Sequence, residues 1–344
     1  MKRRQFIGAG LAAAGVGVLG SRAAFAQSSK QIVVSNWGGD WNDRTVKYIE
    51  QPVLEAKGWK IVRDLNTAPQ RRTKILAEKN LPRGTIDVAH VAISDAYLLN
   101  TNGAIDAIDF GKIPNASDLV PEIKLPYFEP WLYSTWEIVY NPNYIKAPPT
   151  SLAELWNPKY KGKVGVTNQH YEDYMQMASL LATGKLHDLD AAKKKLLELK
   201  QVNQPKVYES HQQIAAGFKG EEIWIACNYR ARGLQFAKDG VPVAVSFPQE
   251  GAALQTFGAV MPKRATHKAE AYEYFNALLD PKQLAELCQA NFYSPASKKV
   301  RLTGDIGQKI LHTPEQMAKL QSPDFGFLAA NTAAMLEWWN KSFV

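Results

Sequence analysis

The feature that most constrains the fold of this chain is a regular alternation of short apolar runs with helical patterns. The predicted segments follow in this order: 31–37 extended, 43–57 helical, 60–65 extended, 71–80 helical, 86–91 extended, 94–100 helical and 106–108 extended. Strands that alternate with helices in this way build α/β proteins with a parallel sheet. In such sheets, ligands bind in the loops beyond the carboxyl ends of the strands. We therefore predict an α/β fold with its binding residues in those loops.

The chain changes character at residues 126–150, where prolines surround one extended run, 135–140. The prolines are Pro126, Pro130, Pro142, Pro148 and Pro149. A chain of 344 residues is long enough for two domains. A proline-flanked strand between two α/β halves is therefore predicted to cross from one domain to the other.

Beyond residue 150 the alternation of strands and helices returns. The predicted strands are 163–167, 222–227, 243–247 and 256–261, and the predicted helices are 173–183, 190–201, 268–279, 281–289 and 329–339. No internal repeat or low-complexity segment interrupts this second half. We predict a second α/β unit.

Residues 1–26 are typical of an export signal and not of a folded domain. Lys2, Arg3 and Arg4 precede an uncharged apolar run, and the segment ends in an Ala-Phe-Ala cleavage site at Ala26. The string RRQFI resembles a twin-arginine signal, although Lys2 occupies a position where Ser or Thr is usual, which leaves Sec export open. The apolar run, about 14 residues, is shorter than the ~20 that a bilayer requires. We predict cleavage after Ala26 and a periplasmic protein.

Charge and cysteine content narrow the function classes. The formal charge of +8 falls to +4 without residues 1–26, because four basic residues and no acid lie there. This balance gives no support to nucleic-acid binding. Cys227 and Cys288 are the two cysteines. In the periplasm they could form a disulfide or remain as two buried thiols, and the sequence leaves both open.

Sequence signatures of common enzymes and cofactor sites are absent. The chain has no GxSxG, HExxH, P-loop or GxGxxG motif. Its six histidines form no pair at the i, i+3 or i, i+4 spacing of a zinc site. We therefore expect neither a metal nor a cofactor, and a protein that is not an enzyme.

Aromatic and polar side chains gather at the predicted strand ends and turns of both halves. The candidate ligand-binding residues are Trp37, Asp40, Ser94, Thr135, Tyr171, Asp173, Tyr229, Arg230, Gln255, Phe257 and Phe292. Asp95, Ser134, Tyr174 and Tyr293 adjoin them in the same segments. Aromatic walls with a few carboxylates suit an organic cation, through cation–π contacts and ion pairs.

Several segments resemble, in order, the periplasmic solute-binding proteins of ABC importers, specifically the spermidine/putrescine-binding type. The matching segments are VVSNWGG (33–39), IDV (86–88), NGAIDAID (102–109), YNP (140–142), PTSLAELWNPKYKGK (149–163), GVPV (240–243), PQEG (248–251), MP (261–262) and LDP (279–281). The block within 152–163 and the EG turn at 250–251 are the most specific of these. The resemblance covers nearly the whole chain after the export signal.

The resemblance implies a two-lobed Venus-flytrap fold, joined by crossing hinge strands, that closes on one solute and then docks on an inner-membrane permease. A ligand stabilises the closed state by contacting both lobes. The resemblance assigns residues 27–138 and about 259–311 to the first lobe, and about 139–258 and 312–344 to the second. It further implies a monomer that binds a polyamine or related amine.

Two positions depart from the polyamine-binding pattern. Phe257 stands where such proteins resemble one another in having an aspartate, and Gln255 stands at the preceding aromatic position. Arg230 follows Tyr229 directly, and a guanidinium would repel a polyamine but would clamp a carboxylate. An opine-like or other amino-acid-derived acidic solute is therefore the alternative. Of the other classes, an exported enzyme would use Cys227 as its nucleophile, and a cofactor-loaded protein would explain twin-arginine export.

Overall fold

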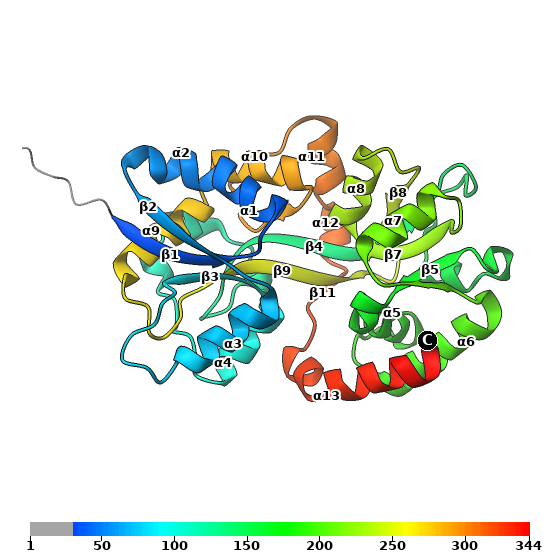
Figure 1. Cartoon of the computed structure of the whole chain (residues 1–344). Coiled ribbons are helices and arrows are strands. Elements are labelled where there is room, and N and C mark those ends of the chain that lie inside the picture. The colour runs from blue at the N-terminus through cyan, green and yellow to red at the C-terminus, as the bar shows by residue number, and fades with distance from the viewer. Residues whose placement is uncertain (1–29) are drawn as a thin grey trace, which may run out of the picture.

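The computed structural model describes residues 30–344, so the predicted export signal and its cleavage site lie outside the described residues. The strands are β1 (Gln31–Asn36), β2 (Lys60–Leu65), β3 (Val88–Ala92), β4 (Glu129–Tyr140), β5 (Val164–Thr167), β6 (Lys206–Tyr208), β7 (Ile225–Tyr229), β8 (Ala244–Ser246), β9 (Ala252–Val260), β10 (Ser294–Pro295) and β11 (Leu320–Gln321). The α-helices are α1 (Asp40–Thr45), α2 (Gln51–Val53), α3 (Ala68–Glu78), α4 (Ile93–Thr101), α5 (Tyr171–Thr183), α6 (Leu189–Asn203), α7 (His211–Lys219), α8 (Arg230–Lys238), α9 (Lys268–Leu278), α10 (Pro281–Asn291), α11 (Gly304–Ile310), α12 (Pro314–Met317) and α13 (Phe325–Trp338). Figure 1 shows them as two α/β lobes side by side.

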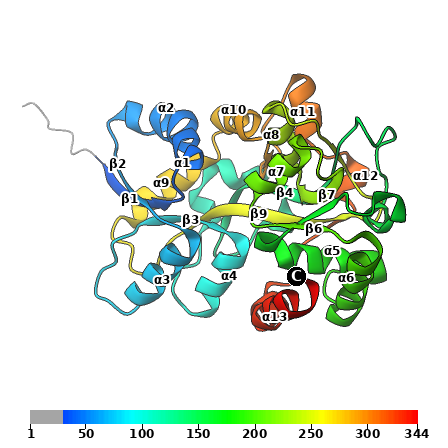
Figure 2. The same ribbon diagram turned by 45° about the vertical axis from the view of Figure 1, so that its right-hand side comes forward.

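The strands are ordered β2-β1-β3-β9-β4-β7-β5-β6. The pairs β1–β2 and β1–β3 are parallel, as are β5–β6 and β5–β7, which confirms the predicted parallel β-α units in both halves. By contrast, β9 runs antiparallel to both β3 and β4. Helices cover both faces of each sheet half (Figure 2). The predicted α/β class and two-lobed architecture are confirmed.

One strand, β4, belongs to both lobes. Its residues 129–135 pair with β9, whereas residues 136–140 pair with β7 and β8. Every residue of β4 is buried. The change of partner after Thr135 therefore marks the crossing predicted for the proline-flanked run. The assignment of the remaining segments to one lobe or the other stays a prediction.

Each lobe has its own apolar core, and β4 contributes to both. Trp131 packs with Ile32 and Phe275 on one side of the crossing. Trp136, five residues later, packs with Tyr174 on the other side. Because the two indoles belong to different cores, β4 fixes both lobes to one backbone while leaving each lobe separately packed.

Several predicted elements differ from the observed ones. The strand predicted at 135–140 begins six residues earlier, because Pro130 sits at a bulge where its missing N–H is tolerated. The run 106–108 forms no strand; the adjacent Ile105 makes an isolated bridge to Pro262. Helices α7 and α8 escaped prediction because each contains a glycine, which weakens a helical pattern.

Those two glycines serve close packing. A Cβ at Gly217 of α7 would lie 2.4 Å from the Tyr208 hydroxyl, and one at Gly233 of α8 would lie 2.5 Å from Val245. Each glycine therefore lets its helix approach a strand of the second lobe more closely than alanine would allow.

Cys227 lies in β7 and Cys288 in α10, and both thiols are free and buried. Of the two alternatives that the sequence left open, the structure has two separate buried thiols. Among residues 30–344, no helix combines the length and apolarity needed to cross a bilayer.

A buried polar network in the first lobe makes stability depend on pH. The Tyr274 hydroxyl donates to Glu50 (2.8 Å) and therefore accepts from His90 Nε2 (2.9 Å). Complete burial and the charge of Arg71 lower the pKa of His90 to about 3. The neutral imidazole is thus the native form.

We expect His90 to reduce stability as pH falls from about 6.5 toward 3. In that window the unfolded chain binds a proton that native His90 does not, which contributes a slope of about 1.4 kcal/mol per pH unit to the free energy of unfolding. Urea unfolding between pH 4 and 6 measures this slope. His90→Gln removes the titrating group and should flatten the dependence by that amount; identical slopes for variant and parent would contradict the assignment.

Candidate binding site

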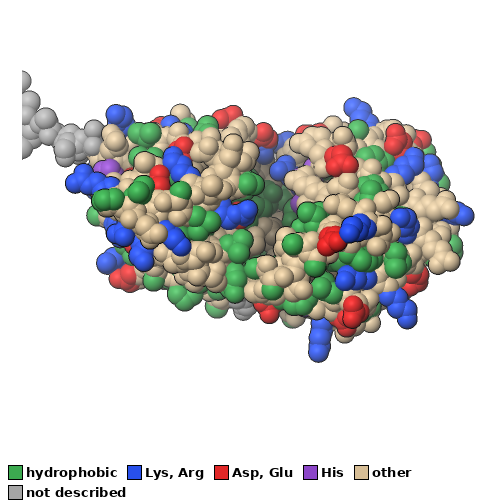
Figure 3. Space-filling view, turned by 60° about the horizontal axis from the view of Figure 1, so that its bottom comes forward, with side chains coloured by type: hydrophobic (Ala, Val, Ile, Leu, Met, Phe, Trp, Pro, Cys, Tyr) green, Lys and Arg blue, Asp and Glu red, His purple; other side chains and the backbone are tan. Residues whose placement is uncertain are grey.

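A cavity of about 520 Å³ lies between the two lobes. Its lining residues are Trp37, Gly38, Asp40, Trp41, Arg44, Ala68, Ala92, Gln169, His170, His211, Gln212, Tyr229, Ala231, Arg232, Gln235, Gln255, Phe257, Asn291 and Tyr293. Figure 3 shows the surface hollowed between the lobes. Because its lining comes from both sides of the crossing strand, closure of the lobes would change the distance between its walls.

An aromatic cluster on the side of the core that contains Trp131 forms one wall. Trp37 follows β1, Trp41 lies in α1, Phe257 in β9, and Tyr293 follows α10. Trp37 contacts Trp41 and Phe257 edge to face, with ring centroids 5.2 and 6.0 Å apart. Phe257 also meets Tyr293 at 5.4 Å. The mutual edge contacts hold these rings as a rigid apolar surface.

One ring of this wall, that of Trp37, already has a cation against it. The guanidinium of Arg71, from α3, lies 4.7 Å from the Trp37 ring centroid. The Arg71 side chain is fully buried, and burial lowers its pKa to about 10, which leaves it charged at neutral pH. The attraction of a cation to an aromatic ring comes from the ring quadrupole, and the charge of Arg71 would repel a second cation placed against the same ring. Trp37 is therefore a poor platform for an ammonium group.

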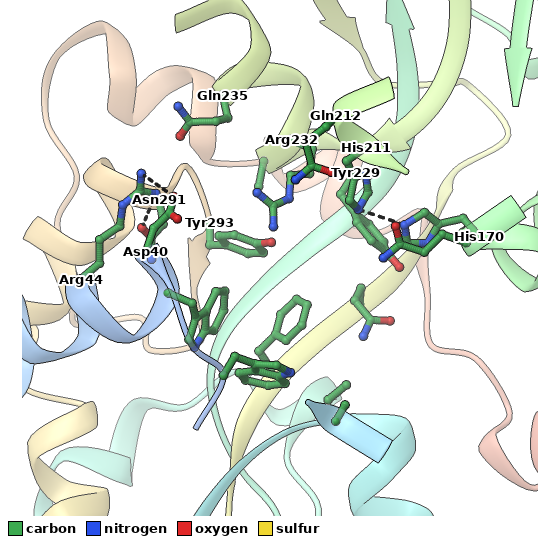
Figure 4. Close-up of a pocket in the computed structure, with 18 of the residues that line it drawn as sticks. Asp40, Arg44, His170, His211, Gln212, Tyr229, Arg232, Gln235, Asn291 and Tyr293 are labelled. Carbon is green, nitrogen blue, oxygen red and sulfur yellow. Dashed lines mark hydrogen bonds and ion pairs between the residues drawn. The ribbon is translucent and has the colours of Figure 1, made fainter. Parts of the chain in front are cut away.

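At the rim, the one acidic residue of the lining is neutralised. Asp40 forms an ion pair with Arg44 one helical turn later (3.2 Å). Arg44 also donates to the Asn291 amide oxygen at 2.9 Å, which ties α1 to the end of α10. Figure 4 shows these three side chains together at one edge of the cavity. The one carboxylate among them is therefore already paired with a guanidinium.

The second lobe contributes a hydrogen-bonded wall. His170 Nε2 lies 2.9 Å from His211 Nε2, and His170 Nδ1 lies 2.9 Å from the Asp173 carboxylate. The Tyr229 hydroxyl donates to the same Asp173 oxygen at 2.9 Å. Burial, the adjacent His170 and the charge of Arg232 lower the pKa of His211 to about 3. His211 is therefore neutral at physiological pH.

Arg232, in the first turn of α8, extends into the cavity (Figure 4). Among the described side chains, the arginines that form ion pairs are Arg44, Arg63, Arg72 and Arg230, and Arg232 has no such partner. Its charge is felt nearby, since it lowers the pKa of His211 and opposes the burial that raises the pKa of Tyr293. A half-buried guanidinium without a carboxylate partner is a ready anion site.

Of the candidate residues named from sequence, five line this cavity. They are Trp37, Asp40, Tyr229, Gln255 and Phe257. Asp173 lies behind them and reaches the lining through its hydrogen bonds to His170 and Tyr229. The structure thus brings together candidates from both halves of the chain.

Four other candidates lie outside the cavity. Ser94 lies in α4, and Ala92 lines the cavity in its place. Thr135 is buried at the crossing, bonded to Glu137 and His312. The Tyr171 hydroxyl donates to Glu172 instead of facing the cavity.

Phe292, the fourth, adopts a left-handed conformation (φ +62°) after α10 and packs into the core. That turn directs the side chains on either side of it, Asn291 and Tyr293, to the cavity.

Arg230, the residue expected to clamp a solute carboxylate, does not line the cavity and is bonded to other parts of the protein. Its Nη1 lies 3.2 Å from the buried Glu137 carboxylate, and its Nε donates to the Lys309 carbonyl at 2.8 Å. Nη2 donates to the Leu311 carbonyl at 3.3 Å. Arg230 therefore ties α8 to β4 and to the segment that follows α11, and Arg232 occupies the cavity instead.

Sequence analysis did not single out Arg232 or His211, because it predicted neither α8 nor α7, the helices on which they lie. Positions 230 and 232 lie about 200° apart around a helix, so that one faces the hinge when the other faces the cavity. The sequence analysis predicts no helix at 230–238. It therefore expects Arg230 at the cavity, because Arg230 follows Tyr229 directly. His170 and His211 are 41 residues apart, and a search for metal-ligand spacings could not pair them.

Comparison with known proteins identifies the family. The profile of bacterial extracellular solute-binding protein matches residues 50–334. The chain belongs to this family. A spermidine/putrescine-binding periplasmic protein from Escherichia coli (strain K12) is 26% identical over 298 residues, which cover 80% of this chain and 81% of the relative.

Solved structures share the fold of this family member. An ABC transporter protein from Clostridium perfringens superposes with a TM-score of 0.77 at 25% identity, covering 91% of this chain and 100% of its own. The PBP AgtB from A. tumefaciens R10, in complex with agropinic acid, gives 0.70 at 20% identity, covering 91% and 98%.

These matches establish the general role of the protein. It is the solute-binding component of an ABC importer, and such components bind small solutes and deliver them to a permease. The family consists of binding proteins, so the exported-enzyme alternative is overturned. Cys227, its suggested nucleophile, is fully buried, and burial raises the pKa of its thiol.

The ion pair of Arg230 with Glu137 should be essential for stability. Hydrogen bonding from His312 and the charge of Arg230 outweigh burial, so the pKa of Glu137 is lowered and its carboxylate is charged. We expect Arg230→Met to reduce the free energy of unfolding by about 3–5 kcal/mol, because it leaves a buried charge without its cation. Urea unfolding at pH 7 measures the loss.

Two variants test this interpretation. Arg301→Met removes an exposed arginine and should change stability by no more than about 0.5 kcal/mol. Adding Glu137→Gln to Arg230→Met should recover much of the loss, because the uncompensated charge is then removed as well. Equal stability of Arg230→Met and Arg301→Met would show that the pair contributes little.

Proposed function

We propose that this binding protein captures a carboxylate-bearing, amino-acid-derived solute, with Arg232 as the anchor of the carboxylate. The observation that carries the proposal is the guanidinium of Arg232, which lines the cavity without an acidic partner among the described residues. A guanidinium binds a carboxylate through two parallel hydrogen bonds, and such charge-assisted bonds are among the strongest in proteins.

The charge balance of the lining supports an acidic solute. Arg44 neutralises Asp40, and burial lowers the pKa of His211 so far that it carries no charge at pH 7. Arg232 therefore leaves the cavity with one excess positive charge. A polyamine entering it would meet this cation and would find no free carboxylate in the lining. Arg71 behind Trp37 further disfavours an ammonium group at the aromatic wall.

A polyamine or related amine remains the second candidate. Curated relatives of 26–27% identity are named as spermidine/putrescine-binding and putrescine-binding proteins. The carboxylate of Asp173, directly behind Tyr229, and that of Asp40 at the rim could attract an amine if lobe closure rearranged their partners. The agropinic acid named with AgtB illustrates that the same fold also accommodates an acid.

We further propose that the chain acts in the periplasm as a monomer, exported through its N-terminal signal with cleavage after Ala26. The relatives are named periplasmic, which supports this location. The two lobes would close on the solute about β4, and the closed form would deliver it to an inner-membrane ABC permease.

A thermal-shift panel tests the solute class directly. We expect acidic and zwitterionic amino-acid derivatives, including agropinic acid, to raise the melting temperature by several degrees, since a ligand at ~1,000 times its Kd adds about 4 kcal/mol. Putrescine and spermidine should give no shift. A shift with polyamines and none with acids would establish the second candidate instead.

Arg232→Gln tests the anchor. We expect it to weaken binding of the acidic solute by about 10- to 150-fold, because hydrogen bonds to a charged group contribute about 1.5–3 kcal/mol. Isothermal titration calorimetry measures the loss. Arg301→Gln, which removes an exposed arginine outside the lining, is the matched control and should bind as the parent does. Unchanged affinity in Arg232→Gln would refute the anchor.

A further inference from the structure

Several uncharged polar side chains of the cavity lining remain once the paired groups are set aside. Asp40 is paired with Arg44, and the imidazoles of His170 and His211 are joined to each other. Arg232 is the proposed anchor of the solute carboxylate. Further polar recognition of the solute therefore falls to side chains that carry no charge.

Three of these uncharged side chains are the glutamines Gln169, Gln212 and Gln255. They come from the turn before α5, from α7 and from β9. A fourth glutamine of the lining, Gln235, donates to Asp239 at 2.9 Å, whereas the other three amides have no hydrogen-bond partner among the described residues. The lining thus carries three unpaired amides.

These amides are open to the cavity. Gln169 and Gln212 are exposed, and Gln255 is half-buried with neither of its amide atoms sealed from solvent. Gln255 and Phe257 are two residues apart on β9, so their side chains project from the same face of the strand, and both line the cavity. An open amide therefore adjoins the aromatic wall.

The hydroxyl of Tyr293 is a fourth open group. The ring is held by edge contacts with Trp41 and Phe257, at centroid distances of 5.5 and 5.4 Å. Figure 4 shows the hydroxyl directed into the cavity. Of the two tyrosines of the lining, Tyr229 donates to Asp173, whereas Tyr293 has no hydrogen-bond partner among residues 30–344.

Amides and hydroxyls both donate and accept hydrogen bonds, which narrows the class of solute that complements them. A hydroxyl group of the solute is likewise a donor and an acceptor. An alkyl chain would displace the water from these groups and leave them without partners, which costs free energy. The adjoining aromatic rings can pack on the C–H groups of a hydroxylated chain.

We propose that the solute bears a polyhydroxylated carbon chain or ring in addition to its carboxylate, and that Gln255 and Tyr293 are specificity-determining residues that bind its hydroxyl groups. The inference rests on the proposed function, because Arg232 holds the carboxylate of the same molecule. Gln169 and Gln212 bind further hydroxyls. The cavity of about 520 Å³ has the volume of a small-molecule site that takes both parts.

Matched ligands that differ only in their hydroxyl groups test this assignment. The pairs are gluconate with hexanoate, and N-(1-deoxyglucityl)glutamate with N-hexylglutamate, titrated into the full chain by calorimetry at pH 7. We expect the hydroxylated member of at least one pair to bind about tenfold or more tightly than its partner, because it gains two or more net hydrogen bonds. If no hydroxylated member binds more tightly than its alkyl partner, the inference is overturned.

Variants of the two specificity-determining residues assign the preference. Gln255→Leu removes the amide at similar size and should cost the hydroxylated member about tenfold while changing its alkyl partner by less than about threefold. Tyr293→Phe deletes one oxygen, keeps the ring and should cost the hydroxylated member about threefold to tenfold. Gln201→Leu, the same change at an exposed position outside the lining, is the control. Equal losses for both members of a pair in Gln255→Leu would overturn the assignment.

Arg232→Gln separates this inference from the proposed function. If both hold, the variant weakens both members of a pair and leaves their ratio unchanged. If Arg232→Gln binds every carboxylate as the parent does, the proposed anchor fails, while a preference for hydroxyls that still depends on Gln255 would stand by itself.

Discussion

The strand β4 is the constraint on which the rest of the structure depends. Its first half completes the sheet of one lobe and its second half that of the other, and all its side chains are buried. Two separately packed cores therefore share one continuous backbone. The cavity lies between the lobes, so any change in the angle at which β4 crosses alters the distance between its walls.

The charged side chains near this crossing have two different surroundings: some are paired with one another inside the protein, and Arg232 lines the cavity. Glu137 on β4 is fully buried and engages Arg230 and His312, which commits these groups to holding the hinge segments together. Arg232, on the opposite side of the same helix, has no such partner among the side chains that the structure describes. One helix thus supplies both the attachment to the hinge and the cation of the cavity, so that Arg230 positions Arg232.

The walls of the cavity differ in chemistry. The first lobe presents aromatic rings held by edge contacts, with Arg71 against Trp37. The second presents two imidazoles, a tyrosine and Arg232. Closure would therefore place the apolar part of a solute on the first lobe and its polar ends on the second.

How far the sequence predicts this protein can be judged from particular residues. The alternation of strands and helices predicted the α/β class, and Trp37, Asp40, Tyr229, Gln255 and Phe257 were placed at the cavity because they follow strands or lie at their ends. The same reasoning misplaced Arg230, because the glycine in α8 concealed the helix on which it lies. Phe292 was misplaced by one residue, since its left-handed conformation turns its neighbours to the cavity.

The sequence by itself determined the α/β class, the two-lobed family and most of the aromatic wall, because these follow from local periodicity and from ordered motifs. Only the tertiary structure decided which arginine lines the cavity and which histidines meet. Those outcomes depend on the rotation of α8 about its axis and on contacts between residues 41 positions apart. Rotation and long-range contact are set by packing, which no local pattern in the chain encodes.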